Sequence, residues 1–129
     1  MIKKKILIVE DDASMRDIIV DKFRLEGYEV EATDNGALGL ERALKNTPDL
    51  ILLDILLPVM DGMTLLKKLR NENSWGKKVP VILLTNLSAD DEGINKSIAE
   101  NEPAYYLVKT DWTLNDVVGK VKERLSSAV

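Results

Sequence analysis

The sequence predicts an α/β domain in which five parallel strands form one doubly wound sheet with helices on both faces. Short apolar runs rich in β-branched or aromatic residues recur along the 129 residues, as buried strands do. Segments with helical spacing separate these runs. A strict alternation of strand and helix requires a parallel sheet covered on both faces. The strand runs are Ile6–Val9, Tyr28–Thr33, Leu50–Leu53, Val81–Leu84 and Tyr105–Val108, of which Tyr28–Thr33 alternates as a strand near an edge does.

Five helices are predicted by apolar residues that recur on one stripe. The first is expected to end at Gly27, because glycine readily adopts the left-handed conformation that ends helices. The last begins with a capping-box pattern, in which Thr113 is followed three residues later by Asp116. The stripes in chain order are Met15, Ile18, Ile19 and Phe23; Leu40, Ala43 and Leu44; Leu65, Leu66 and Leu69; Ile94 and Ile98; and Leu114, Val117, Val118, Val121 and Leu125.

Right-handed crossover connections leave few topologies for five such strands. The commonest is the flavodoxin-like strand order 2-1-3-4-5, in which the winding direction reverses between the first and third strands. Ligands of such sheets bind outside the carboxyl ends of the strands at this reversal. We therefore expect a functional site just after Val9 and Leu53.

Composition excludes several classes of function. With 22 acidic and 18 basic side chains, a net charge of -4 and a pI near 4.9, direct binding of nucleic acid is not expected. The absence of Cys and His removes thiol nucleophiles, Ser-His catalysis and His- or Cys-ligated zinc. No apolar run approaches the roughly 20 residues of a membrane span, so we expect a cytoplasmic protein without membrane contact. The length predicts a single domain over residues 1–129 with no output domain.

Carboxylates gather where the site is expected. The first strand runs into Glu10, Asp11 and Asp12, and the third runs into Asp54. Two carboxylates about 4 Å apart repel by roughly 4 kcal/mol at an effective dielectric of about 20, so the set indicates a bound cation. Mg²⁺ is the expected ion, with Mn²⁺ as the alternative, because it takes carboxylates, a carbonyl and waters and usually accompanies phosphate. Any one of these acids alone is more simply explained as a helix cap or a strand end.

Two further strands end in groups that suit an anion. Thr85 ends the fourth strand and Lys109 the fifth, which places a hydroxyl and an ammonium at the acidic edge. Asp54 could attach such an anion itself, since a carboxylate can attack a phosphoryl group to give an aspartyl phosphate. The metal and Lys109 would offset the transferred charge, and Thr85 would donate a hydrogen bond. Taken alone, Lys109 could simply form a structural ion pair, and Thr85 could be an ordinary strand residue.

The most specific motif is the string D-x3-P-x2-D-G that runs from Asp54 to Gly62. Together with the acids, Thr85 and Lys109 in this order, it resembles a response-regulator receiver domain of two-component signalling, of the single-domain kind found in chemotaxis. The likeness covers essentially the whole chain. Its segments are residues 6–12, 48–62, 80–85 and 106–109.

The resemblance implies that Asp54 accepts a phosphoryl group from a histidine kinase or a phosphotransfer protein in a Mg²⁺-dependent reaction. Asp11 and Asp54 would bind the metal directly, and Glu10 through a water. The backbone carbonyl of Leu56 would be a further ligand. Asp12 falls one place too late and is interpreted as a helix N-cap. The protein would then be a stand-alone signalling module rather than an enzyme, limited to self-catalysed phosphotransfer and slow autodephosphorylation.

A switch and a partner face are also implied. The Thr85 hydroxyl would move to the phosphoryl group, and Tyr106 would turn inward into the vacated space. Tyr105 should face the opposite side of the sheet. A downstream protein would bind the face formed by the fourth helix, fifth strand and fifth helix, and a homodimer would share that face.

Several positions depart from the family pattern. Thr110 follows Lys109 where the family has proline, so we expect a trans bond and an altered exit from the fifth strand. Asn86 replaces a very small residue near the phosphoryl position. Glu102 replaces a glycine, which predicts that Asn101 ends the fourth helix in the left-handed conformation. Trp75 and Trp112 are expected in loops.

These departures leave alternatives open. A phosphorylation-independent pseudo-receiver scaffold is the first. A Mg²⁺-dependent phosphohydrolase with an aspartyl nucleophile is disfavoured, because Leu56 stands where such enzymes need a general acid. Leu56 and Leu87 also cannot position an attacking water, which predicts slow dephosphorylation. A flavin-binding protein is disfavoured because acids, rather than a phosphate-binding loop, follow the first strand.

Overall fold

The computed structural model describes residues 3–85, 96, 99–108 and 112–126. Within these ranges the five predicted strands form one parallel sheet in the predicted order, β2-β1-β3-β4-β5. No helix in the described ranges has the length and apolar character that a membrane crossing requires. The elements are β1 (Lys5–Val9), α1 (Ala13–Leu25), β2 (Glu29–Thr33), α2 (Gly36–Asn46), β3 (Leu50–Asp54), α3 (Gly62–Glu72), α4 (Ser74–Lys78), β4 (Val81–Thr85), β5 (Tyr105–Val108) and α6 (Leu114–Ser126).

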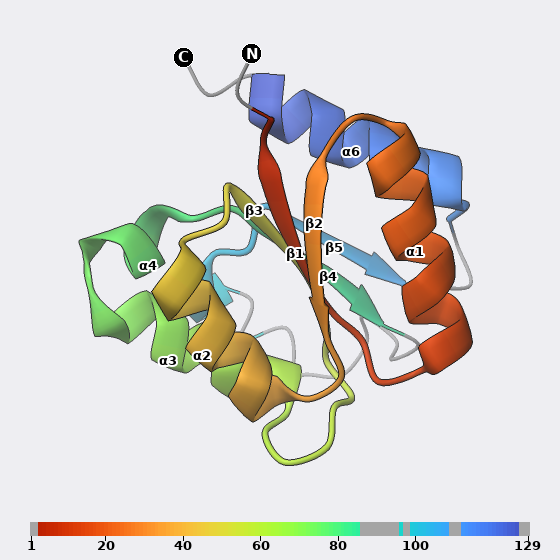
Figure 1. Cartoon of the computed structure of the whole chain (residues 1–129). Helices are drawn as coiled ribbons and strands as arrows, with labels where there is room; N and C mark the ends of the chain where they lie inside the picture. Colours follow the sequence, from red (N-terminus) through yellow and green to blue (C-terminus); the bar gives the residue numbers. More distant parts are fainter. Residues whose placement is uncertain (1–2, 86–95, 97–98, 109–111, 127–129) are drawn as a thin grey trace.

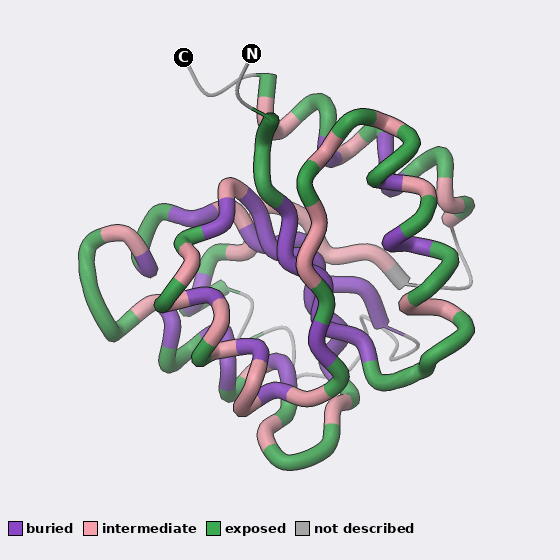
Figure 2. The backbone as a smooth tube through the Cα atoms, viewed as in Figure 1, coloured by how far each residue is buried: buried purple, intermediate pink, exposed green. Residues whose placement is uncertain are grey.

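The sheet separates two apolar cores. Helices α1 and α6 cover one face, and α2 and α3 cover the other (Figure 1). Successive side chains of a strand point to opposite faces, so Leu52 packs with α1 and α6 while Leu53 packs with α2 and α3. Figure 2 shows the central strands buried along their length. Continuous apolar runs predicted these strands because both of their faces are covered.

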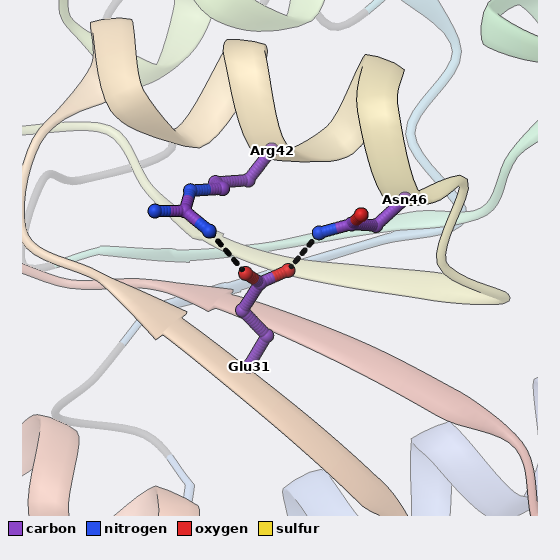
Figure 3. A network of polar contacts seen from close by, with 3 residues as sticks. All are labelled: Glu31, Arg42 and Asn46. Atoms are coloured by element: carbon purple, nitrogen blue, oxygen red, sulfur yellow. Dashed lines mark hydrogen bonds and ion pairs between the residues drawn. The ribbon is translucent and has the colours of Figure 1, made fainter.

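Edge strand β2 differs, as its alternating sequence predicted. The central strands are buried along most of their length, whereas in β2 only Thr33 is buried and the other four residues are half-buried or exposed. Glu31 accepts hydrogen bonds from Arg42 Nη1 at 3.2 Å and from Asn46 Nδ2 at 2.8 Å, both on α2 (Figure 3). The ion pair between Glu31 and Arg42 is partly exposed, so it contributes at most about 1 kcal/mol. These bonds hold the edge strand against α2.

Side chains cap the helices at several predicted positions. Asp12 accepts a hydrogen bond from the Met15 amide at 3.0 Å and so begins α1, as expected. The capping box before α6 is reciprocal: Thr113 N donates to Asp116 Oδ2 at 2.8 Å, and Asp116 N donates to Thr113 Oγ1 at 3.2 Å. Gly27 has a φ of +96° just after α1 ends, which confirms the predicted stop.

Four details of the prediction were wrong. The short segment α4 is an additional helix between α3 and β4, so Trp75 lies in a helix rather than in a loop. Its five residues are too few to show a helical period. Ile18, a member of the predicted stripe, is 54% exposed, because α1 turns Ile19, Val20 and Phe23 toward the core. Glu102 rather than Asn101 is left-handed, with a φ of +45°.

The other tryptophan and the fourth helix can be placed in part. Trp112 lies outside the helices and strands and packs against the core beneath α1 and α6. Residues 99–101 are helical, where the fourth helix was predicted. The predicted stripe residues Ile94 and Ile98 lie outside the described ranges.

Arg70 ties the end of α3 to two later segments. Its Nη1 donates to the carbonyls of Gly76 at 2.8 Å and Val79 at 2.7 Å. Its Nε donates to Asn101 O at 2.8 Å, and Nη2 to Glu102 O at 3.1 Å. Burial lowers the pKa of the guanidinium by removing water from its charged form, and the nearby Glu102 charge acts in the opposite direction. Arginine nevertheless stays charged, and all four bonds are charge-assisted.

Replacing Arg70 with methionine should therefore lower the free energy of unfolding by about 2 to 3 kcal/mol. The cost arises because partly buried carbonyls lose a charged donor. Urea denaturation measures the change, with Lys68→Met as the matched control, since Lys68 is exposed on the same helix. Equal effects of the two substitutions would contradict a bridging role for Arg70.

Candidate metal centre

Three carboxylates converge at the carboxyl edge of the sheet. Glu10, Asp11 and Asp54 each present an oxygen, and these oxygens lie within 4.8 Å of one another. The pairing of β1 with β3 sets Val9 beside Leu53, so the residues that follow these two must meet. Glu10 and Asp54 are 3% and 7% exposed, whereas Asp11 is exposed to solvent. The structure therefore brings together the acids that strand order alone placed at one edge.

This donor set fits a hard divalent cation. At the Mg–O distance of about 2.1 Å, two opposite ligands lie about 4.2 Å apart, close to the observed limit of 4.8 Å. A small rotation of one carboxylate, or a water between Glu10 and the ion, makes up the difference. Carboxylates this close repel by roughly 3 kcal/mol a pair at an effective dielectric of about 20, which a cation would offset. Mg²⁺ and Mn²⁺ both suit an all-oxygen set.

The loop after β3 folds tightly back on Asp54. The Leu56 amide donates to Asp54 Oδ1 at 3.2 Å, and the Gly62 amide donates to Ile55 O at 2.8 Å. A Cβ on Gly62 would lie 2.1 Å from the carbonyl oxygen of Asp54, so only glycine allows this approach. The last position of the D-x3-P-x2-D-G string therefore requires glycine for steric reasons. That the Leu56 carbonyl binds a metal stays a prediction.

The same loop is held from the other side by the start of α2. The Gly36 amide donates to Pro58 O at 3.4 Å. A Cβ on Gly36 would lie 1.7 Å from Met60 O, so this glycine also permits a close backbone contact. Asp61 then accepts from the Thr64 amide at 2.8 Å and caps α3. Both ends of the loop are therefore anchored.

Val59, between these anchors, has an unfavourable backbone. Its φ is +70°, and its side chain is 84% exposed, so burial does not offset the strain. A β-branched residue in this region is a genuine outlier. Val59→Gly should raise the free energy of unfolding by about 1 kcal/mol, because glycine adopts positive φ without a Cβ clash.

Thermal or urea denaturation of Val59→Gly tests this. Val59→Thr is the matched control, since threonine is also β-branched and keeps the strain. A gain shared by both variants would show that the backbone is not its source.

The remaining predicted site residues lie at the expected ends of the strands or outside the described ranges. Thr85 is fully buried at the end of β4, one residue past Leu84, which pairs with Asp54. Tyr106 packs on the α2 and α3 side of the sheet and Tyr105 on the α1 and α6 side, as predicted. Lys109, Thr110, Asn86 and Leu87 lie outside the described residues. Their roles stay predictions.

One residue beside the acids was missed from the sequence. Arg16 in α1 is half-buried, and its Nη1 donates to the carbonyl of Glu10 at 2.9 Å and to that of Asp11 at 3.4 Å. A signal was present, because a basic residue close to a helix N-terminus opposes the helix dipole. The other basic residues of α1, Lys22 and Arg24, lie in its last turn, where the dipole favours them.

Comparison with known proteins gives a consistent result. The family model of the response regulator receiver domain matches residues 6–121. The transcriptional activator protein PfeR of Pseudomonas aeruginosa is 40% identical over 91 residues, which are 70% of this chain and 28% of that protein. The transcriptional regulatory protein PrrA of Mycobacterium tuberculosis is 35% identical over 121 residues, or 94% of this chain and 49% of that protein. The chain thus spans less than half the length of these two regulators.

Solved structures are similar over nearly the full chain. A CheY-like receiver domain protein from Methanospirillum hungatei has a TM-score of 0.88 at 28% identity, with 98% of this chain and 96% of that chain covered. The receiver domain of a sensor histidine kinase from Pseudomonas aeruginosa has a TM-score of 0.82 at 26% identity, covering 95% of this chain and 97% of that one. In that structure a magnesium ion is coordinated in the active-site cleft.

Proposed function

This chain belongs to the response regulator receiver domain family, and on that premise we propose that Asp54 accepts a phosphoryl group in a Mg²⁺-dependent reaction. Phosphorylation would then change which protein the domain binds. The observation that carries the proposal is the convergence of oxygens from Glu10, Asp11 and Asp54 within 4.8 Å. The magnesium ion in the cleft of a similar receiver domain supports the choice of metal.

In the proposed phosphoryl transfer, the new covalent bond forms at Asp54, and the other side chains supply charge and hydrogen bonds. An Asp54 carboxylate oxygen attacks the phosphorus, and the bond from phosphorus to the donor breaks, so that the leaving group departs with the electron pair. A metal held by Glu10, Asp11 and Asp54 would supply positive charge next to the transferred group. Thr85 would donate a hydrogen bond from its hydroxyl to a phosphoryl oxygen. Lys109, which follows the fifth strand, would offset the negative charge of the phosphoryl group.

Intact-mass spectrometry after incubation with acetyl phosphate tests this function. We expect one added phosphoryl group in the presence of Mg²⁺ and none after chelation of the metal. A receiver domain known to accept phosphate, treated in parallel, shows that the conditions are adequate. If that control is labelled and this protein is not, the pseudo-receiver scaffold becomes the better account.

The partners follow from the same proposal. The phosphoryl donor would be a histidine kinase or a phosphotransfer protein, in the cytoplasm. The downstream protein would bind a face that includes β5 and α6, whose described residues are largely half-buried or exposed. A homodimer through this face is the alternative. Both curated relatives are transcriptional regulators at least twice as long as their match, so the prediction of no nucleic acid contact concerns this domain and rests on its charge of -4.

The phosphorylated state should be long-lived. Leu56, two residues after the acceptor, is 53% exposed and has no polar atom with which to orient a water. Leu56→Asn should shorten the half-life of the phosphoprotein on the order of tenfold, less than the ~100-fold of a true general base, because an amide can only orient the water.

The decay is followed by intact mass after removal of the donor. Val59→Asn adds the same amide at another exposed position of the loop and serves as the control. Identical half-lives for native protein and Leu56→Asn would contradict this explanation of slow decay.

A further inference from the structure

We propose that Arg16 is a positioning residue for the metal site: its guanidinium holds the carbonyls of Glu10 and Asp11 and so fixes the directions of these two acidic side chains. This inference rests on the proposed function, because it concerns the same site. It assigns a role to a residue that contacts neither a metal nor a phosphoryl group itself.

Arg16 makes three hydrogen bonds to the segment from Glu10 to Asp12, two from its side chain and one from its backbone. The guanidinium Nη1 donates to Glu10 O at 2.9 Å and to Asp11 O at 3.4 Å. The backbone amide of Arg16 donates to Asp12 O at 2.8 Å. This last bond is the first i→i−4 bond of α1 and does not depend on the side chain, so the guanidinium itself holds two carbonyls.

Other bonds complete the restraint. The Glu10 amide donates to Thr33 O at 3.1 Å, which continues the pairing of β1 with β2. The Asp12 carboxylate accepts from the Met15 amide at 3.0 Å. Bonds to the Glu10 amide and to the three carbonyls of this segment restrict rotation of its peptide planes. The Cβ directions of Glu10 and Asp11 are then set before any ion arrives.

The location of Arg16 separates this role from a simple charge effect. An arginine near the start of a helix gains nothing from the helix dipole. Its positive charge beside the acids should also repel a cation, because like charges at short range oppose binding. If charge were all that mattered, removal of Arg16 would tighten metal binding. If positioning dominates, its removal weakens metal binding. The two accounts therefore predict opposite signs.

The loss expected from positioning is about 10-fold or more, since outer partners that orient metal ligands typically contribute 10- to 100-fold in affinity. Arg16→Gln should bind Mn²⁺ about 10-fold more weakly than the native protein, despite the lost positive charge. Arg16→Lys keeps the charge but not the planar fork that reaches two carbonyls, and should lose a similar factor. Arg24→Gln removes an exposed charge from the other end of α1 and should match the native protein.

Titration with Mn²⁺ alone, followed by the electron paramagnetic resonance signal of the free ion, gives these affinities without phosphorylation. Hydrogen exchange of the amides in residues 10–12 should be faster in Arg16→Lys than in the native protein. Equal or tighter Mn²⁺ binding by Arg16→Gln or Arg16→Lys would overturn the inference. If circular dichroism shows that Arg16→Gln does not fold, the lysine variant alone decides. Failure of the native protein itself to bind Mn²⁺ would instead count against the proposed function.

Discussion

Asp54→Asn should abolish phosphoryl transfer from acetyl phosphate, whereas Asp61→Asn should leave it unchanged. The first substitution removes the attacking carboxylate oxygen and one of three converging metal ligands. The second lies seven residues later, where Asp61 is exposed and caps α3 through its Oδ1. Asparagine caps helices as well as aspartate does, so the fold should be unaffected.

Intact-mass spectrometry with Mg²⁺ and acetyl phosphate distinguishes the two variants. The native protein and Asp61→Asn should each gain one phosphoryl group, and Asp54→Asn none. Labelling of Asp54→Asn to the native extent would place the acceptor elsewhere and reject the proposed role of this residue. The pair is informative because both changes convert an aspartate to an amide, one at each end of the loop between β3 and α3.

Gly62→Ala should strongly destabilise the protein, because the added methyl group meets the backbone of Asp54 itself. Its new Cβ would lie 2.1 Å from Asp54 O and 2.8 Å from Ile55 Cα, and neither backbone atom can move aside cheaply. We expect the free energy of unfolding to fall by about 3 kcal/mol, the upper range for overpacking. Because the strain falls on Asp54 itself, Mn²⁺ binding should weaken as well.

The same change of glycine to alanine in α6 should have the opposite effect on the free energy of unfolding. Gly119 is exposed within α6, and no atom lies within 4 Å of a Cβ built there. Gly119→Ala should raise the free energy of unfolding by up to about 1 kcal/mol, the difference in helix propensity. Urea denaturation of both variants tests the pair. Similar stabilities for Gly62→Ala and the native protein would mean that the loop after β3 is not packed as described.

Much of this fold could be predicted because its signals are local. The buried strands are continuous apolar runs, and the capping residues Asp12 and Thr113 with Asp116 act within one helical turn. Strand order then places Glu10, Asp11 and Asp54 together, since the ends of β1 and β3 must meet in a parallel sheet. No three-dimensional information was needed for these steps.

The features that were missed depend on contacts or backbone angles that exist only in the folded chain. Arg70 bonds to carbonyls of Asn101 and Glu102, 31 and 32 residues away, whose positions exist only once the chain has folded. Arg16 acts on backbone carbonyls, so the signal of a basic residue near a helix N-terminus did not show which groups it contacts. The positive φ of Val59 runs against the preference of its residue type, so local rules could not find it.

The most direct test of the central claim is to identify the residue that carries the phosphoryl group in the unaltered protein. Borohydride reduces an aspartyl phosphate to homoserine, which peptide mass spectrometry locates. After treatment with acetyl phosphate and Mg²⁺, we expect homoserine at position 54 and at no other aspartate. Homoserine at another position, or none while a control receiver domain is labelled, would contradict the assignment of Asp54 as the phosphoacceptor.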